Sequence, residues 1–125
     1  MNTTSEEILS IIINLEYLLK RSDKFDIRLK VLHLINKNEK TNPNLLIEKL
    51  GMARSNIAIM CNRLIKENLI VKHREPANKK EIYYTITDEG KDYLLQNYNK
   101  ADEKLANLKN KKQLHKLADQ LSKIV

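Results

Sequence analysis

The chain has 125 residues, 42% of them hydrophobic, which leaves room for one folded domain with a modest core. No run approaches the roughly 18 apolar residues of a membrane span, and residues 1–7 lack the positive start of a signal peptide, so we expect neither a membrane protein nor a secreted one. The net charge of +7 favours an anionic partner such as nucleic acid, and the single cysteine, Cys61, excludes an intrachain disulfide and is typical of a cytoplasmic protein.

The N-terminal segment predicts a helix with more apolar surface than one face can hold. Thr4 followed by Glu7 has the spacing of a capping box, which marks the start of a helix. Apolar residues follow at helical spacing, and others widen the stripe: Ile8, Leu9, Ile11, Ile12, Ile13, Leu15, Leu18 and Leu19. A terminal helix that is apolar on two sides must be covered on two sides, so we expect a partner chain.

The next stretch predicts two helices separated by a polar turn. The first runs from about residue 24 to 36, and its expected inner face is Ile27, Val31, Leu34 and Ile35. The pair Asn42-Pro43 is a strong helix start, because asparagine caps a helix and proline fits its first position. This second helix is short and ends at Gly51, since glycine adopts the left-handed conformation at no steric cost.

A further helix and a hairpin follow this tight turn. The helical pattern resumes shortly after Gly51 and stops near Asn68, with its buried side expected at Ile57, Cys61, Leu64 and Ile65. Residues 69–71 then begin a strand, residues 75–80 form a polar turn, and residues 82–86 are rich in Tyr, Thr and Ile, as strands are. Two strands around a basic tip make a hairpin.

From Thr87 the pattern is helical almost to the end of the chain. One apolar register comprises Leu94, Tyr98, Ala101, Leu105 and Leu108, and a second comprises Leu114, Leu117, Leu121 and Ile124. The phase slips at residues 110–112, where we expect a break. The end of the chain, like its start, carries more apolar helix than one small domain can cover.

A short helix, a tight glycine turn, a second helix and a basic hairpin are the parts of a winged helix-turn-helix. The second helix of such a pair fits the DNA major groove, about 12 Å wide, and the hairpin reaches the neighbouring backbone or minor groove. The fold class predicted is therefore mainly α with a small β-hairpin wing, flanked by N- and C-terminal dimerisation helices.

Residues 46–95 resemble the MarR family (multiple antibiotic resistance regulators). The matching skeleton comprises Leu50-Gly51-Met52, Arg54-Ser55, Ile57, Arg63-Leu64, Leu69-Ile70 and Thr87-Asp88-Glu89-Gly90. The chain departs from the family pattern in three places. Ala53 replaces the usual Ser or Thr helix cap, which suggests that Ser55 caps one turn late; Ile59 replaces a frequent polar residue; and Asn78-Lys79-Lys80 replaces Asp-Arg-Arg in the wing.

The predicted DNA contacts follow from the motif. Asn56, Ile59 and Asn62 lie opposite the buried side of the second helix, and we interpret them as base-reading residues rather than an ordinary solvent face. Arg54 and Ser55, near the helix start, are expected to bind phosphate. For Arg63 the pattern leaves open a DNA contact or a structural partner in the wing. The remaining predicted backbone contacts are cations of the wing: Lys72, Arg74, Lys79 and Lys80.

The resemblance implies a homodimer on double-stranded DNA, at an inverted-repeat operator, acting as a repressor. We assign residues 24–91 to the DNA-binding region and residues 1–22 and 92–125 to dimerisation helices. The family also includes members that bind small aromatic or anionic effectors between head and dimer helices. The residues show no convergent polar pocket for an effector, so that partner is left open.

No motif predicts an enzyme, a cofactor or a metal site. There is no phosphate loop or nucleophile elbow, and His33, His73 and His115 lack companions at ligand spacing. The helical spacing of Cys61 points inward, which favours an inert buried thiol over a redox sensor. The rival hypothesis is a winged-helix module that binds a protein, because Ala53, Ala58 and Ile59 leave the second helix unusually apolar.

Overall fold

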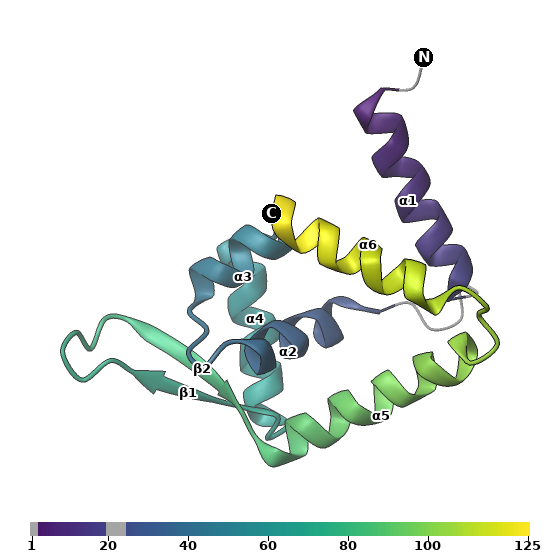
Figure 1. Ribbon diagram of the computed structural model, residues 1–125. Helices are drawn as coiled ribbons and strands as arrows, with labels where there is room; N and C mark the ends of the chain where they lie inside the picture. Colours follow the sequence, from purple (N-terminus) through teal and green to yellow (C-terminus); the bar gives the residue numbers. More distant parts are fainter. Residues whose placement is uncertain (1–2, 20–24) are drawn as a thin grey trace.

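The computed structural model describes residues 3–19 and 25–125, and this part of the chain forms six helices and one two-stranded hairpin (Figure 1). In chain order the elements are α1 (Thr4–Leu18), α2 (Ile27–Lys37), α3 (Pro43–Leu50), α4 (Arg54–Lys66), β1 (Ile70–Arg74), β2 (Ile82–Ile86), α5 (Asp88–Leu105) and α6 (Lys111–Ile124). The predicted mainly helical architecture with a hairpin wing is confirmed.

The hydrophobic core lies in what we call the head, which is formed by α2, α3, α4, β1 and β2. Its buried residues come from each of these elements, from the α4–β1 junction and from the first turns of α5: Leu29, Val31, Leu32, Ile35, Leu46, Ile57, Cys61, Leu64, Leu69, Ile70, Tyr84 and Leu94. A single core shared by all these elements holds α4 and the hairpin in a definite relation to each other.

Helix α2 differs from the sequence prediction at its start and in its buried face. It begins at Ile27, because the Asp26 side chain accepts a hydrogen bond from the Leu29 backbone N–H at 2.9 Å and caps the helix. The predicted start at residue 24 lies outside the described residues. Leu29 and Leu32 are buried as well as Val31 and Ile35, because α3, α5 and β2 pack around the helix on more than one side.

The N-terminal capping box is present one residue earlier than predicted. The Thr3 hydroxyl accepts a hydrogen bond from the Glu6 N–H at 3.1 Å, and the Glu6 carboxylate accepts one from the Thr3 N–H at 3.1 Å. Thr4 is already the first helical residue. The prediction from Thr4 and Glu7 was therefore wrong in register, because both reciprocal bonds form with the preceding pair.

Within the head, the hairpin is bonded along one edge to the loop that precedes α3. Strands β1 and β2 pair antiparallel, with Ile70 opposite Ile86 and Arg74 opposite Ile82. On the other edge of β2, Tyr84 exchanges two backbone hydrogen bonds with Thr41, at 2.8 and 3.3 Å. The base of the hairpin is thereby fixed to the same loop that leads into α3.

The start of α5 is joined tightly to the end of α4. The Thr87 side chain caps α5 by accepting from the Gly90 N–H at 2.9 Å, and its hydroxyl donates to the Asn68 carbonyl at 2.7 Å. A Cβ on Gly90 would lie 2.2 Å from the Leu69 carbonyl oxygen, so only glycine permits this close approach. The Thr-x-x-Gly pattern therefore sets where the long helix leaves the head.

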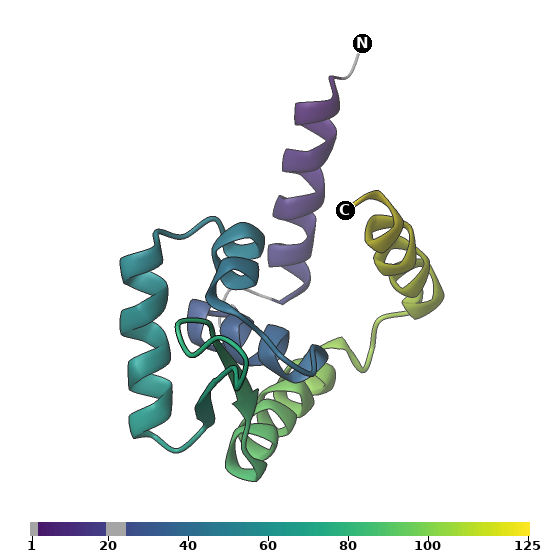
Figure 2. The ribbon, with the colours of Figure 1, turned by 90° about the vertical axis from the view of Figure 1, so that its left-hand side faces the viewer.

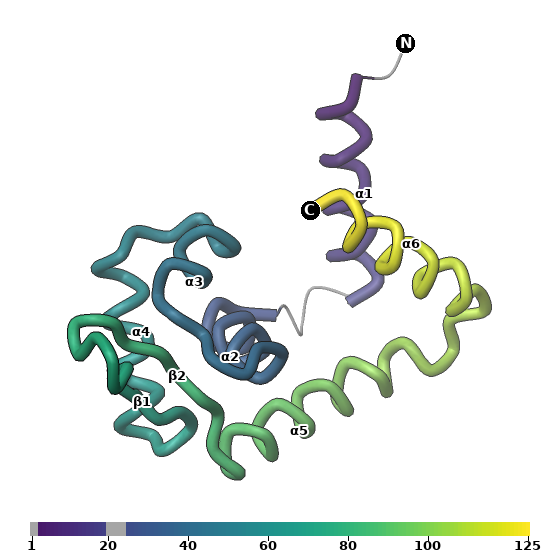
Figure 3. The backbone as a smooth tube through the Cα atoms, turned by 60° about the vertical axis from the view of Figure 1, so that its left-hand side comes forward, coloured from purple at the N-terminus to yellow at the C-terminus, as the bar shows by residue number. Residues whose placement is uncertain are grey.

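The terminal helices lie largely outside the head. Figures 1 and 2 show α1 projecting away from it, and Figure 3 shows α5 running from the base of the hairpin away from the head before the chain turns into α6. Neither α1 nor α6 contains a buried residue. The break between α5 and α6 begins after Leu105, earlier than the predicted residues 110–112, and Leu108 lies within it. None of the helices in the described ranges is long and apolar enough to cross a membrane.

Candidate nucleic-acid interface

Two helices joined by a tight turn form the centre of the interface. Asn42 caps α3 by accepting from the Leu45 N–H at 2.9 Å, and Pro43 occupies the first helical position. Gly51 ends α3 with φ at 62°, and its N–H donates to the Ile47 carbonyl at 2.9 Å. The left-handed residue turns the chain sharply enough for α4 to follow almost at once. These features were all predicted from the sequence.

Helix α4 begins without a side-chain cap. Its N-cap residue is Ala53, which has no side-chain acceptor, and Ser55 lies inside the first turn. The prediction that Ser55 caps the helix one turn late was wrong, because α4 already starts at Arg54. The first backbone N–H groups of α4 thus lack a side-chain acceptor from the N-cap, and such groups favour an anion.

The two faces of α4 have opposite character. Ile57, Cys61 and Leu64 are buried in the core. Asn56 and Asn62 are exposed, and Ile59 keeps 53% of its surface exposed. The opposition of these two sets was predicted from their helical spacing. Asn68 ends this region with φ at 63°, which agrees with the predicted helix end.

The tip of the hairpin carries exposed cations on an ordered turn. The Arg74 guanidinium donates to the Lys79 carbonyl at 3.0 Å, and the Asn78 side chain accepts from the Lys80 N–H at 3.2 Å. The side chains of Lys79 and Lys80 are exposed, as is that of Lys72 on β1. Arg74 therefore shapes the turn, while the lysines beside it project into solvent.

Arg63 lies near the end of α4 in a group of charges that face α2. It is exposed, and together with Arg28 it lowers the pKa of Glu67, although Arg28 contributes the larger effect through a hydrogen bond. Arg28 forms an ion pair with Glu67 and stacks over the Tyr93 ring at 5.0 Å. Arg63 thus acts electrostatically on this group, and its predicted contact with DNA or with the wing stays a prediction.

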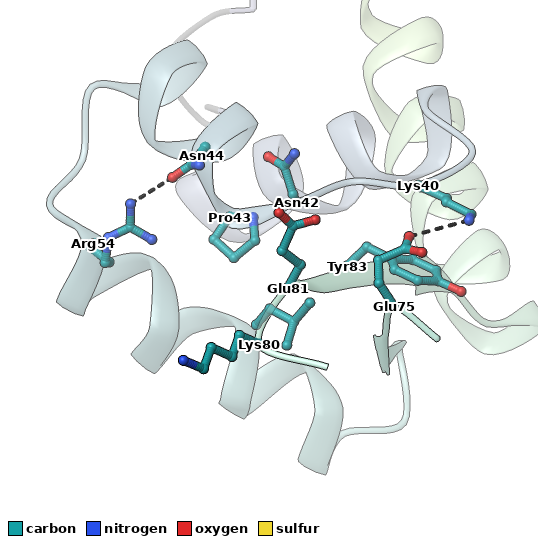
Figure 4. A pocket seen from close by; sticks show the side chains of 10 residues that line it. Lys40, Asn42, Pro43, Asn44, Arg54, Glu75, Lys80, Glu81 and Tyr83 are labelled. Carbon is teal, nitrogen blue, oxygen red and sulfur yellow. Dashed lines mark hydrogen bonds and ion pairs between the residues drawn. The ribbon is translucent and has the colours of Figure 1, made fainter. Parts of the chain in front are cut away.

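A polar pocket lies between α3, the start of α4 and the hairpin (Figure 4). It has a volume of about 310 Å³ and is lined by Lys40, Asn42, Pro43, Asn44, Arg54, Glu75, Lys80, Glu81, Ile82 and Tyr83. Sequence reasoning predicted only Arg54 and Lys80 as functional here. The other lining residues lie on separate elements, and no sequence pattern relates them.

A second, apolar pocket of about 440 Å³ lies where α2, α3 and α5 meet. Its lining comprises Phe25, Leu29, Lys30, His33, Leu34, Lys49, Leu50 and Tyr98. His33 Nδ1 and the Tyr98 hydroxyl are 2.6 Å apart across the α2–α5 contact. Burial, with a smaller effect of Lys37, lowers the pKa of His33, which favours the neutral ring at neutral pH. Sequence reasoning did not identify this pocket.

The thiol of Cys61 is buried and unreactive. Cys61 is fully buried, and burial raises its pKa to about 11, which leaves almost no thiolate at neutral pH. Among residues 3–19 and 25–125 no group of three or more His, Cys, Asp or Glu side chains could hold a metal ion. The prediction of an inward-pointing cysteine is confirmed.

These parts define a winged helix-turn-helix protein: a capped short helix, a glycine turn, a second helix with one exposed face, and a cationic hairpin beside it. Residues 27–106 match the family described as winged helix DNA-binding domain, and the chain belongs to this family. A family of DNA-binding domains agrees with the prediction that the protein is not an enzyme.

Solved structures extend the likeness of fold to nearly the whole chain. The solved structure of the multiple antibiotic resistance repressor MarR matches with a TM-score of 0.71 and 19% identity over 100% of this chain and 96% of that one. RV1404 from Mycobacterium tuberculosis matches with a TM-score of 0.75 and 14% identity over 98% and 97%. The repressor CouR, solved on a 23-mer DNA duplex, matches with a TM-score of 0.67 and 19% identity over 98% and 92%.

The predicted resemblance to MarR is confirmed as a likeness of fold that includes the terminal helices. At the level of sequence, the uncharacterized HTH-type transcriptional regulator YvnA of Bacillus subtilis (strain 168) is 31% identical over 64 residues. That match spans 51% of this chain and 41% of YvnA, so the chain aligns with less than half of that relative's length.

Proposed function

We propose that the protein is a transcriptional repressor that binds an inverted-repeat operator in double-stranded DNA as a homodimer. The observation that carries this proposal is the exposed face of α4 beside an exposed cationic hairpin, within a winged helix DNA-binding domain. MarR and CouR, which share the fold, are both described as repressors.

In this proposal α4 enters the major groove. Asn56 and Asn62 read adenine edges through their amides, and Ile59 contacts a thymine methyl group. Arg54 and Ser55 bind phosphate together with the uncapped N–H groups of α4. Four cations contact the DNA backbone on either side of the groove: Arg63, Arg74, Lys79 and Lys80. Arg74 can do so because it retains N–H donors beyond the one that bonds the Lys79 carbonyl.

The dimer is supported by the apolar surface of the terminal helices. Exposed apolar residues on α1 include Ile8, Leu9, Ile12 and Ile13, each about half exposed, and the end of α6 exposes Ile124. We assign residues 1–22 and 92–125 to dimerisation and residues 24–91 to DNA binding. Two-fold symmetry would then present two α4 helices roughly 34–36 Å apart, one turn of DNA.

The apolar pocket at the α2–α5 contact supports a small-molecule effector as an additional partner. Its lining is largely aromatic and aliphatic, and Lys30 and Lys49 supply positive charge, so a small aromatic acid fits its chemistry. A ligand there would contact both the head and the helix that leaves it. Titration of the DNA complex with benzoate tests this partner: release of DNA by benzoate but not by cyclohexanol supports it, and no release by either contradicts it.

A gel shift with the DNA upstream of the protein's own gene tests the main proposal, with sedimentation of the free protein alongside it. We expect a salt-sensitive complex of one dimer per duplex. A well-folded monomer at micromolar concentration would contradict the dimer. The alternative function, a winged-helix module that binds a protein, draws on the apolar exposed Ile59, and a folded dimer that binds no DNA at low salt would favour it.

A further inference from the structure

The side chain of Arg54 is held by a residue of the preceding helix. Arg54 is the first residue of α4, and its Nη2 donates to the Oδ1 atom of Asn44 at 2.6 Å (Figure 4). Asn44 lies in the first turn of α3 and is exposed, so it contributes nothing to the core. The hydrogen bond therefore joins two exposed side chains across the helix-turn-helix, at the rim of the polar pocket.

Two cations on opposite sides of that pocket have partners of different charge. On one side, Lys40 is paired with the Glu75 carboxylate at 3.3 Å and lies over the Tyr83 ring at 4.9 Å, so it already has an anionic partner. On the other side, Arg54 has a neutral partner and keeps its full charge. Figure 4 shows these two interactions at opposite sides of the pocket.

We propose that Asn44 is a positioning residue that holds the Arg54 guanidinium toward a phosphate of the DNA backbone passing between the start of α4 and the hairpin. This inference rests on the proposed DNA-binding function and assigns a role in it to a residue outside the recognition helix and the wing. Arg54 uses one donor on Asn44, and its remaining N–H donors stay available for a phosphate oxygen.

A neutral acceptor suits this role better than an acidic one. An arginine side chain has many rotamers, and fixing it before binding removes part of the entropy cost of forming the complex. A carboxylate at position 44 would also fix Arg54, but it would cancel the charge that attracts the phosphate. The identity of residue 44 as asparagine thus matters as well as its position.

A double-mutant cycle on the full-length protein tests the proposal. The probe is a labelled mixed-sequence duplex of about 30 bp, long enough for two half-sites one helical turn apart. Phosphate contacts do not depend on base sequence, so this probe reports them directly. The dissociation constant is measured over a range of salt concentrations for Arg54→Ala, Asn44→Ala, both together, and Asn44→Asp.

We expect Arg54→Ala to weaken binding about tenfold and to lower the salt dependence by about 0.9 for each phosphate that the variant no longer neutralises. Asn44→Ala should weaken binding about threefold to fivefold in the wild-type background, and it should have no further effect once Arg54 is alanine. Asn44→Asp should weaken binding more than Asn44→Ala and lower the salt dependence, since it keeps the acceptor and adds a negative charge.

Asn36→Asp, at an exposed asparagine on α2, carries the same change of charge on another element and should leave binding nearly unchanged. Thermal unfolding checks that each variant is folded. Equal losses from Asn44→Ala in the wild-type and Arg54→Ala backgrounds, or no loss in either, would overturn the positioning role. Failure of the wild-type protein to bind any duplex at low salt would instead overturn the proposed function itself.

Discussion

The head and the terminal helices contrast in how they use apolar residues. Helix α2 has 11 residues and buries Leu29, Val31, Leu32 and Ile35, whereas α1 has 15 residues and buries none. About half of the residues in each of the two helices are nevertheless apolar. Apolar composition alone therefore does not create a core, because a helix buries its residues only where other elements cover them. The head completes its own core, and in the proposed homodimer a second chain covers the apolar residues of the terminal helices.

Helix α5 belongs to both regions. Its first turns enter the head through Gly90 and the buried Leu94, while Leu95, next along the chain, is 57% exposed. Further along, Tyr98 still meets His33 of α2. A change in the direction of α5 would thus alter its contacts with α2. Variants of the head and of the terminal helices therefore test the two regions separately, and variants at the α2–α5 contact test them together.

The largest expected effect is the loss of a core side chain in the head. Leu32 is fully buried, so Leu32→Ala should lower the free energy of unfolding by about 3 kcal/mol, through lost burial and the cavity left behind. Urea denaturation at a fixed protein concentration measures this change. A loss below about 1 kcal/mol would mean that the head is loosely packed and the contrast with α1 is weaker than we describe.

The next effect concerns association rather than folding of the head. Ile12→Lys on α1 should raise the dissociation constant of the dimer by roughly a hundredfold, because an apolar side chain is replaced by a charged one in each of two symmetry-related chains. Sedimentation over a range of concentrations measures it. Asn14→Lys, on the same helix and also exposed, provides the matched control. A dimer unaffected by Ile12→Lys would exclude this face of α1 from the interface.

Variants of the hairpin test whether DNA affinity depends on the position of its lysines or only on the net positive charge of the protein. Lys79→Ala combined with Lys80→Ala should weaken binding to any duplex about tenfold and make its salt dependence shallower. Lys37→Ala with Lys91→Ala removes the same charge from exposed positions on α2 and the start of α5 and should have a much smaller effect. Fluorescence anisotropy at several salt concentrations compares the pairs. Equal losses for both would show that net charge, and not the position of the hairpin, controls affinity.

The exposed face of α4 should affect the choice of sequence more than overall affinity. Asn56→Ala or Asn62→Ala should cost about 1 to 2 kcal/mol on an operator selected from a random library, and almost nothing on a mixed-sequence duplex. Competition binding with the two duplexes measures the ratio. If both duplexes lose affinity equally, these asparagines contact the backbone and do not read bases.

The smallest effect is a pH dependence at the α2–α5 contact. The pKa of His33 is lowered in the folded protein, mainly by burial and to a smaller extent by Lys37. At a pH below 6.5, the ordinary pKa of histidine, the unfolded chain therefore binds more protons at this site than the folded protein does. Stability from this contact is complete above pH 6.5 and should decrease as the pH falls through the lowered folded value. Thermal unfolding between pH 7.5 and about 5 compares wild type with His33→Asn. An identical pH dependence in the variant would assign the effect to other groups.

Local chemistry explains which parts of the fold were predictable. The ends of α3 and α4 could be predicted because caps and left-handed residues depend only on their near neighbours in the chain. These residues are Asn42, Pro43, Gly51 and Asn68. The faces of α4 were visible because helical spacing separates buried from exposed positions. The start of α1 was misplaced by one residue, since Thr3 and Thr4 are equally suited to cap a helix and only the reciprocal bonds to Glu6 distinguish them.

The winged helix-turn-helix itself, the cationic hairpin and the surplus apolar surface at both ends were therefore determined by the sequence alone, because each depends on spacing and on residue type. Only the tertiary structure decided which side chains meet across elements: Arg54 with Asn44, Arg28 with Glu67, and His33 with Tyr98. Such pairs depend on how the helices pack, and no periodicity in the sequence records them. The capped glycine turn was predictable because it depends on local geometry. The partner of Arg54 across that turn was not predictable, because it depends on a contact between two helices.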